Sequence, residues 1–375
     1  MTGWKRRLAL IGVVIVLLGT GVVVGGKVLL NRLDSAIPRA DLFGPSPTST
    51  TPGPTPTPST SPTPQPGADI VGPLNILIAG IDTRVTKPNW IPRADAVMVM
   101  HISKDLSHAY LTSLPRDLVV NIPAFGPSNY GGGRTKLGHA MAVGSRVPGT
   151  AKPNPAQGFQ LLARTVSNYT GIQRFDAGAI LTFGGLRGVV DAIGGIDMYI
   201  DQRVVSIHIR PDGIHRTVCS SCSHGYGGPS ATYNVGMMHL VGWQAIDYAR
   251  QRYISGGDYA RQRHQRQMIK AMMGQVLKQN VFFDPVKLNS LVTALGSALV
   301  FDGRGHGVID FAFALRNLKP ENVVLVGLPG SGVYGSSGYL GESLGSIASS
   351  YFAAVRNDTT ETFLSRNPGL VNVSP

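Results

Sequence analysis

Two acidic residues lie beside neighbouring apolar runs in the first third of this 375-residue chain. Asp82 follows the run at residues 74–79, and Asp95 immediately precedes the run at residues 96–102. Carboxylates together with substrate phosphates are the usual ligands of Mg²⁺, which keeps several of its waters and takes few protein ligands. An Asp at a strand end is also a common turn former, so neither residue is conclusive alone. As a pair, they are candidate Mg²⁺ ligands.

Arginines flank both acidic residues. Arg84, Arg93 and Arg116 each lie within a few positions of the end of an apolar run. A guanidinium group binds phosphate oxygens through two parallel hydrogen bonds, so three of them beside two carboxylates suit a pyrophosphate with its metal. An ordinary salt-bridge cluster is the alternative interpretation.

A second basic group follows much later in the chain. Arg250 and Arg252 are two positions apart, so both point to one side if the segment is extended. Arg261 and Gln265 are four apart, on one face of an expected helix and near its N-terminus, where anions are favoured. The alternatives are a solvated face and a nucleic-acid surface. The segment lacks the interleaved aromatic residues that stack bases, which disfavours nucleic acid.

Lys136 follows a run of glycines at residues 131–133. Glycines permit the backbone to approach a ligand closely. The spacing does not match a nucleotide-binding P-loop, so Lys136 is a candidate anion ligand of another kind.

The chain has two cysteines, Cys219 and Cys222, with two residues between them. Three interpretations fit this spacing: a thioredoxin-like motif, half of a zinc site with His215 or His224, and a local disulfide. Because we expect this part of the chain to lie outside the membrane, the disulfide is favoured.

Three apolar runs, at residues 74–79, 96–102 and 109–114, predict neighbouring strands. The loop at residues 83–94 contains two prolines and is too short for a crossover helix, so the strands should be antiparallel. The meander then brings the end of the first strand, the start of the second and the end of the third to one rim of the sheet.

The pattern changes further along the chain. Residues 176–183 predict a strand, 184–193 a helix and 196–200 another strand, which together make a β-α-β unit. A long amphipathic helix is predicted at residues 258–278. The fold class is therefore α/β, with a mixed sheet flanked by helices in an α-β-α sandwich.

The N-terminus predicts a membrane anchor. Three basic residues precede an apolar stretch at residues 8–30, which is long enough to cross a bilayer. Basic residues prefer the cytoplasmic flank, so residues 1–7 are expected inside the cell and the bulk of the chain outside. A cleaved signal peptide is the alternative, but it has a shorter apolar core and a small-residue cleavage site.

Residues 31–73 form a linker rich in Pro, Ser and Thr, whose prolines favour an extended stalk. We expect an extracellular catalytic domain at residues 74–330 and a C-terminal extension at residues 331–375. The 34 Lys+Arg against 21 Asp+Glu give a net charge of +13, which requires an anionic partner without identifying it.

Several of these segments together resemble the LytR-CpsA-Psr family. The resemblance covers about residues 74–278, and it consists of the segments 75–84, 93–98, 113–117 and 136–137, followed by the Arg250, Arg252 and Arg261 group. The anchor also fits this family. Two departures lie in the basic shell: His264 stands where many members have Arg, and Gly138-His139 replace an Asn-Ala pair.

The resemblance implies a membrane-anchored phosphotransferase of the cell wall. It would transfer a glycopolymer from a polyprenyl-pyrophosphate carrier to peptidoglycan through a phosphodiester, with pyrophosphate hydrolysis as a side activity. It implies that Asp82 and Asp95 are Mg²⁺-associated catalytic acids. Arg116 is implied to be catalytic together with these two acids, and to contact pyrophosphate. The other positions implied to contact pyrophosphate or substrate are Arg84, Arg93, Lys136, Arg250, Arg252, Arg261 and Gln265.

The candidates for the general base are Asp82, Asp95 and Asp117. Two other functions are alternatives to transfer. A non-catalytic binder would hold polyprenyl pyrophosphates or acidic wall polymers with the same residues. A transcriptional regulator would need a cytoplasmic nucleic-acid domain, for which the seven residues before the apolar stretch are too few.

Overall fold

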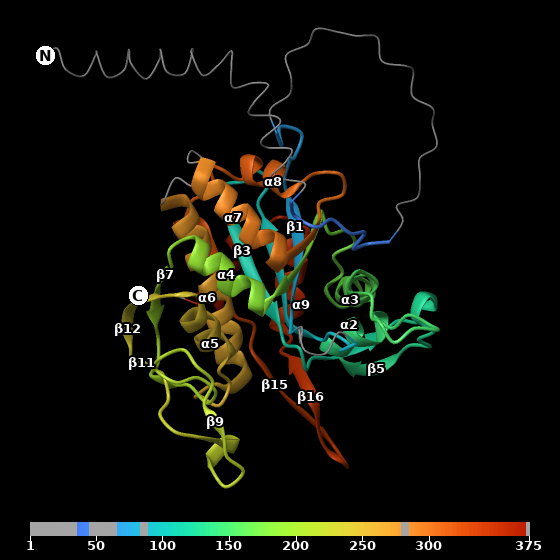
Figure 1. Ribbon diagram of the computed structural model, residues 1–375. Coiled ribbons are helices and arrows are strands. Elements are labelled where there is room, and N and C mark those ends of the chain that lie inside the picture. Colours follow the sequence, from blue (N-terminus) through green and yellow to red (C-terminus); the bar gives the residue numbers. More distant parts are fainter. Residues whose placement is uncertain (1–35, 45–65, 83–88, 279–284, 373–375) are drawn as a thin grey trace, which may run out of the picture.

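The computed structural model describes residues 36–44, 66–82, 89–278 and 285–372. A six-stranded sheet lies at its centre, in the order β13-β6-β1-β2-β3-β14 (Figure 1). The strands are β1 (Leu74–Ile81), β2 (Ala94–Ile102), β3 (Ala109–Leu114), β6 (Ala177–Thr182), β13 (Leu299–Asp302) and β14 (Val323–Val326).

The predicted anchor at residues 8–30, the cytoplasmic residues 1–7 and most of the linker lie outside the described residues. Within the described part of the chain, no helix combines the length and apolarity that a membrane crossing needs.

The predicted antiparallel meander is confirmed. Ile81 pairs with Ala94 between β1 and β2, and Val97 pairs with Leu114 between β2 and β3. The end of β1, the start of β2 and the end of β3 therefore share one rim of the sheet. Strand β6 runs parallel to β1 and β14 runs parallel to β3, so the sheet is mixed, as predicted.

Helices cover both faces of the sheet because side chains alternate along its strands. On β1, Leu77 and Ala79 point to one hydrophobic core, whereas Leu74 points to the other. The first core also holds α2 (Gly138–Gly144), α3 (Pro155–Thr170), α9 (Ile347–Arg356) and α10 (Thr360–Arg366). The second holds α4 (Phe183–Ala192), α5 (Gly242–Arg250), α6 (Gly257–Lys278), α7 (Pro285–Ala298) and α8 (Val308–Ala314). The α-β-α sandwich is confirmed.

The predicted β-α-β unit is only half correct. Helix α4 follows β6 as expected, but the next strand, β7 (Ile196–Ile200), does not join the central sheet. It pairs antiparallel with β12 (Gly236–Leu240). Because β1 and β13 already occupy both edges of β6, no position beside β6 remains for β7.

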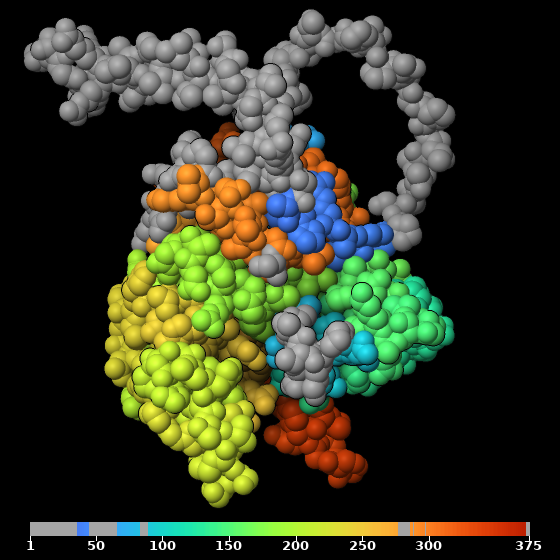
Figure 2. Space-filling view, in the orientation of Figure 1, coloured from blue at the N-terminus to red at the C-terminus, as the bar shows by residue number. Residues whose placement is uncertain are grey.

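Residues 201–241, which we call the cap, leave the sandwich between α4 and α5. The cap carries short antiparallel pairs: β8 (Val204–Val205) with β11 (Thr232–Tyr233), and β9 (Thr217–Val218) with β10 (Tyr226–Gly227). In Figure 2 the cap, in yellow-green, and the red hairpin of β15 (Gly330–Gly335) and β16 (Gly338–Leu344) are two projections at the same end of the molecule.

The segment after residue 330 also contributes to the core. Tyr351 and Phe352 of α9 are almost fully buried, and the Tyr351 hydroxyl hydrogen-bonds that of Thr112 on β3. The prediction of a C-terminal extension at residues 331–375 did not include this packing. A glycine at 341 is required because φ is +151° and a Cβ would lie 2.3 Å from the Asp117 carbonyl oxygen.

Candidate active site

A cavity of about 770 Å³ opens at the rim where β1, β2 and β3 meet α4, α5, α6 and the cap. Most of the residues singled out in the sequence line it together, although they come from segments far apart in the chain. These residues are Asp82, Asp95, Arg116, Arg250, Arg252, Arg261 and Gln265.

Asp95, near the start of β2, is held by an arginine that follows β3. Arg116 Nη1 donates to Asp95 Oδ1 over 2.6 Å, and Arg116 Nε lies 3.6 Å from Asp117 Oδ2. Burial alone would lower the pKa of Arg116, but the hydrogen bond and charge of Asp95 raise it above the ordinary value. The register of the meander creates this pair by bringing the two strand ends together.

Asp82, just after β1, meets the last residue of α5. Arg250 Nη2 donates to Asp82 Oδ2 over 3.3 Å, and the Arg250 guanidinium lies 5.4 Å from the ring centroid of Phe183 on α4. Both charged side chains are more than a third exposed, so their pairing contributes little to stability. The guanidinium can therefore exchange this partner for an anionic ligand at low cost.

Arg252 sits on the cap side of the cavity and stacks against an aromatic ring. Its guanidinium lies 5.3 Å from the centroid of Tyr253, and the His224 ring lies 4.8 Å from the same Tyr253 ring. His224 belongs to the cap. Through His224 the cap therefore contacts Tyr253, the residue next to Arg252.

Helix α6 contributes two deeply buried polar residues. Arg261 Nη2 donates to Asp258 Oδ1 at 2.7 Å and to the Asp95 carbonyl oxygen at 3.1 Å. Burial lowers the pKa of Arg261, and the charge of Asp258 opposes that effect. Gln265 is 1% exposed, and within the described residues neither its amide nitrogen nor its amide oxygen has a hydrogen-bond partner. Buried polar groups are almost always bonded to protein or to water, so the Gln265 amide is available to a water or a ligand in the cavity.

Three predicted ligands are not placed in the cavity. Lys136, at the end of the hairpin formed by β4 (Val119–Ile122) and β5 (Gly133–Lys136), pairs with Asp117 at 3.2 Å. Neither of these two residues lines the cavity, and the exposed Arg93 does not line it either. Arg84 lies outside the described residues.

The two carboxylates fit the expected role of Mg²⁺ ligands in chemistry and in position. Asp82 and Asp95 line the same cavity, and their oxygens are of the type that Mg²⁺ binds. Across the described ranges, no group of three or more His, Cys, Asp or Glu side chains is arranged to hold a metal ion. Two carboxylates leave the remaining coordination positions of Mg²⁺ to water and to oxygens such as those of substrate phosphates.

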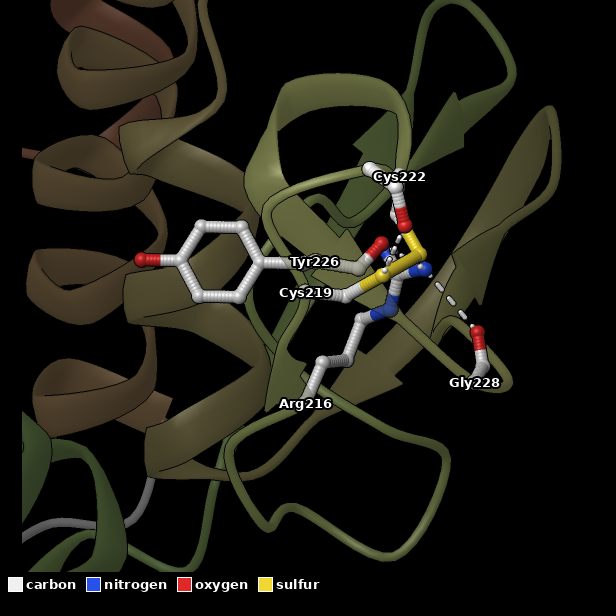
Figure 3. The surroundings of a disulfide bond; sticks show 6 residues. Arg216, Cys219, Cys222, Tyr226 and Gly228 are labelled. Atoms are coloured by element: carbon white, nitrogen blue, oxygen red, sulfur yellow. Dashed lines mark hydrogen bonds between the residues drawn. A yellow bond between two sulfur atoms is a disulfide. The ribbon is translucent and has the colours of Figure 1, made fainter.

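The cap wall of the cavity is held by a disulfide and by one arginine (Figure 3). Cys219 and Cys222 are joined by a disulfide bond, which is the favoured one of the three interpretations of this pair. Arg216 donates to the carbonyl oxygens of Tyr226 at 3.0 Å and Gly228 at 2.9 Å, and to that of Ile207 at 2.8 Å. These bonds tie separate segments of the cap together.

Several residues that line the cavity were not predicted from the sequence. They come from α4, from the cap and from the start of α5, and include Phe183, Arg187, His208, Tyr226 and Trp243. His215 and His224, considered above only as zinc ligands beside the cysteines, line the cavity as well. No motif marks the cap residues, because only the antiparallel pairs of the cap bring them over the rim. Arg187 lines the cavity from α4, the helix predicted at residues 184–193.

The fold and the cavity define an α/β protein with an arginine-rich pocket at the rim of a mixed sheet. The model of the LytR_cpsA_psr family matches residues 55–352, and the chain belongs to this family.

Relatives and a solved structure agree with this assignment. The chain is 27% identical over 263 residues to the polyisoprenyl-teichoic acid–peptidoglycan teichoic acid transferase TagU of Enterococcus faecalis, covering 70% of this chain and 73% of that protein. It is 25% identical over 260 residues to the cell wall biosynthesis protein LcpA of Corynebacterium glutamicum, covering 68% of this chain and 46%, or about half, of the relative. The structure of gbs0355 from Streptococcus agalactiae has the same fold, with a TM-score of 0.58, 21% identity, and coverage of 76% of this chain and 88% of that one.

Proposed function

We propose that this protein is a membrane-anchored phosphotransferase that moves a glycopolymer from a polyprenyl-pyrophosphate carrier to peptidoglycan. One observation carries the proposal: five arginines and three aspartates, distant in sequence, line a single cavity at the sheet rim. The similarity to TagU, named for the transfer of teichoic acid to peptidoglycan, supports it. The anchor at residues 8–30 would hold the domain at the extracellular face of the membrane, beside the lipid carrier.

The reaction is a displacement at phosphorus. A hydroxyl oxygen of peptidoglycan attacks the phosphorus next to the sugar and forms a new P–O bond. The bond from that phosphorus to the bridging oxygen breaks, and polyprenyl phosphate leaves with the electron pair. The hydroxyl proton passes to a base, and the product is a phosphodiester between glycopolymer and peptidoglycan.

The chain's own residues supply positioning and charge. Phosphoryl transfer depends mostly on these two effects, because negative charge spreads over the phosphate oxygens. Arg250, Arg252 and Arg261 hold the pyrophosphate oxygens, while Gln265 donates its amide hydrogens. Arg116 keeps the Asp95 carboxylate at the rim.

Asp82 and Asp95 would hold Mg²⁺, which when bound neutralises negative charge on the phosphate oxygens. Of the three candidate bases, Asp82 and Asp95 line the cavity whereas Asp117 does not. This position favours Asp82 and Asp95 as candidate bases. The carboxylate of Asp247, which also lines the cavity, already accepts hydrogen bonds from Ser206, Tyr233 and Gln251.

The test uses full-length protein in detergent with a polyprenyl-pyrophosphate oligosaccharide, peptidoglycan fragments and Mg²⁺. We expect mass spectrometry to detect oligosaccharide joined to peptidoglycan through a phosphodiester, and Asp95→Asn to abolish this product. An exposed cap carboxylate outside the cavity, Asp212, provides the matched control Asp212→Asn. Tight lipid binding without any transfer by the wild type would instead identify a binding protein.

A further inference from the structure

A second cavity, of about 310 Å³, lies on the other side of α6. Successive helix residues are about 100° apart, so Tyr259 and Arg266 point away from Arg261 and Gln265, which line the first cavity. The second cavity shares no lining residue with the first. It is lined by Tyr259, Gln262, Arg263, Arg266, residues 327–330, Gly369, Leu370 and Asn372.

Arg266 is the unusual residue of this cavity. It is 3% exposed, and its Nη2 donates to Asn372 Oδ1 at 2.5 Å. Among the described residues, its Nε has no hydrogen-bond partner, and no carboxylate forms an ion pair with it. Burial, and next the charge of Arg263, lower the pKa of Arg266 to about 9, so it is still charged at neutral pH.

A buried charge is costly unless it is paired. The neighbouring Arg263 is already paired, because its Nε donates to Asp201 Oδ2 at 2.5 Å. The cavity therefore contains one guanidinium whose charge no described carboxylate balances.

Two glycines in the cavity wall leave space around the polar atoms that face the cavity. A Cβ at Gly327 would lie 3.3 Å from Arg266 Nη2, and a Cβ at Gly330 would lie 2.2 Å from the Tyr259 hydroxyl oxygen. Larger side chains would crowd the groups that face the cavity. The space beside the guanidinium is thus preserved by the backbone around it.

We propose that this second cavity binds a small oxyanion, a carboxylate or a phosphate group, on Arg266. A planar guanidinium binds both groups with two parallel hydrogen bonds, so they share the chemistry that this site recognises. Peptide carboxylates and phosphodiester polymers are the two sources. The site is separate from the transfer cavity, and it does not depend on the proposed function.

The test is thermal unfolding of the full-length protein in detergent, titrated with sodium phosphate or sodium acetate at constant ionic strength. Because the first cavity also attracts anions, all proteins carry Arg250→Gln and Arg252→Gln. In this background we compare Arg266→Gln with Arg316→Gln, a change at an exposed arginine that lines neither cavity. Without either anion, Arg266→Gln should be at least as stable as the background, because it removes an unpaired buried charge.

We expect phosphate or acetate to raise the melting temperature saturably in the background protein and in Arg316→Gln. In Arg266→Gln the apparent affinity should fall at least tenfold, since charge-assisted hydrogen bonds are lost. The anion that binds more tightly identifies the source: acetate points to peptide carboxylates and phosphate to phosphodiesters.

A second variant tests the cavity without removing the charge. A Cβ at Gly369 would meet nothing within 4 Å, so Gly369→Leu can extend into the cavity without a clash at Cβ. It should abolish the saturable stabilisation while Arg266 remains. Loss of stability in anion-free Arg266→Gln would mean that another part of the chain pairs with this arginine. That result, or equal anion stabilisation in all variants, would overturn the proposal.

Discussion

Arg116 Nη1 lies 2.6 Å from Asp95 Oδ1, so the end of one strand holds the carboxylate at the start of its neighbour. Both side chains are about one-quarter exposed. The carboxylate is therefore fixed in orientation while it still faces the cavity. A substrate that binds at this rim meets a charge pair that is already ordered, and ordering in advance reduces the entropy that binding would otherwise cost.

Substitutions of Asp82 and Asp95 should change how transfer and binding depend on Mg²⁺, whereas substitutions of the arginines should not. We expect Asp82→Asn and Asp95→Asn each to abolish transfer and to weaken the dependence of substrate binding on Mg²⁺. Each change keeps the size of the side chain but removes the charge that a metal ion needs. Transfer assays over a Mg²⁺ titration measure both effects. Full turnover in either variant would remove that residue from the site.

Arg250 and Arg252, at the C-terminal end of α5, should contribute to substrate affinity even in the absence of Mg²⁺. We expect Arg250→Ala and Arg252→Ala each to weaken affinity for a polyprenyl pyrophosphate by roughly ten- to a hundredfold, because each charge-assisted hydrogen bond contributes about 1.5–3 kcal/mol. Arg→Lys should restore only part, since it keeps the charge but loses the two-pronged geometry. Titrations with and without Mg²⁺ provide the measurement, with Arg316→Ala as control. Wild-type affinity in both variants would show that these arginines form a solvated surface.

The cap should depend more on Arg216 than on the disulfide. The Cys219–Cys222 bond closes a very short loop, and the entropy that a disulfide removes from the unfolded chain grows with loop length. We expect Cys219→Ser with Cys222→Ser to change the melting temperature little. Arg216→Ala, which leaves three carbonyl oxygens without their donor, should raise KM several-fold and expose the cap to limited proteolysis. An unchanged KM in Arg216→Ala would mean that the cap does not contact the substrate.

A buried histidine should make the protein less stable in mild acid. His264 is fully buried, with Nε2 3.0 Å from Asp201 Oδ1 and its ring 4.2 Å from that of Tyr248. Burial lowers the pKa of His264, and this outweighs the opposing effect of Asp201.

An unfolded histidine has a pKa of about 6.5, so as pH falls through that value the unfolded chain takes up the proton first. Stability should therefore decrease below about pH 6.5. His264→Gln should flatten the curve of melting temperature between pH 7 and pH 5, whatever its effect at pH 7. Parallel curves for wild type and variant would contradict this assignment.

Sequence patterns predicted the meander and the long helix because both are local: alternating or periodic apolar residues determine them without reference to distant segments. The same patterns did not place β7, since strand pairing depends on which sheet edges other segments occupy. Within the candidate site, the pairing of Asp95 with Arg116 follows from the meander. The contacts of His224 with Tyr253 depend on the cap, whose short strands carry no periodic signal.

The way residues 36–44 attach to the sheet has a mechanical consequence. Phe301 N donates to the Pro38 carbonyl oxygen, and Leu42 N donates to Asp302 on the edge strand β13. Asp302 pairs with Gly178 of β6, which in turn pairs with Leu77 of β1. Leu77 precedes Asp82 by five residues, which is about 16 Å along the strand. A pull on the chain ahead of residue 36 would load these edge contacts first. The rim that carries Asp82 would be shielded from that tension, so the cavity would keep its shape while the protein is under load.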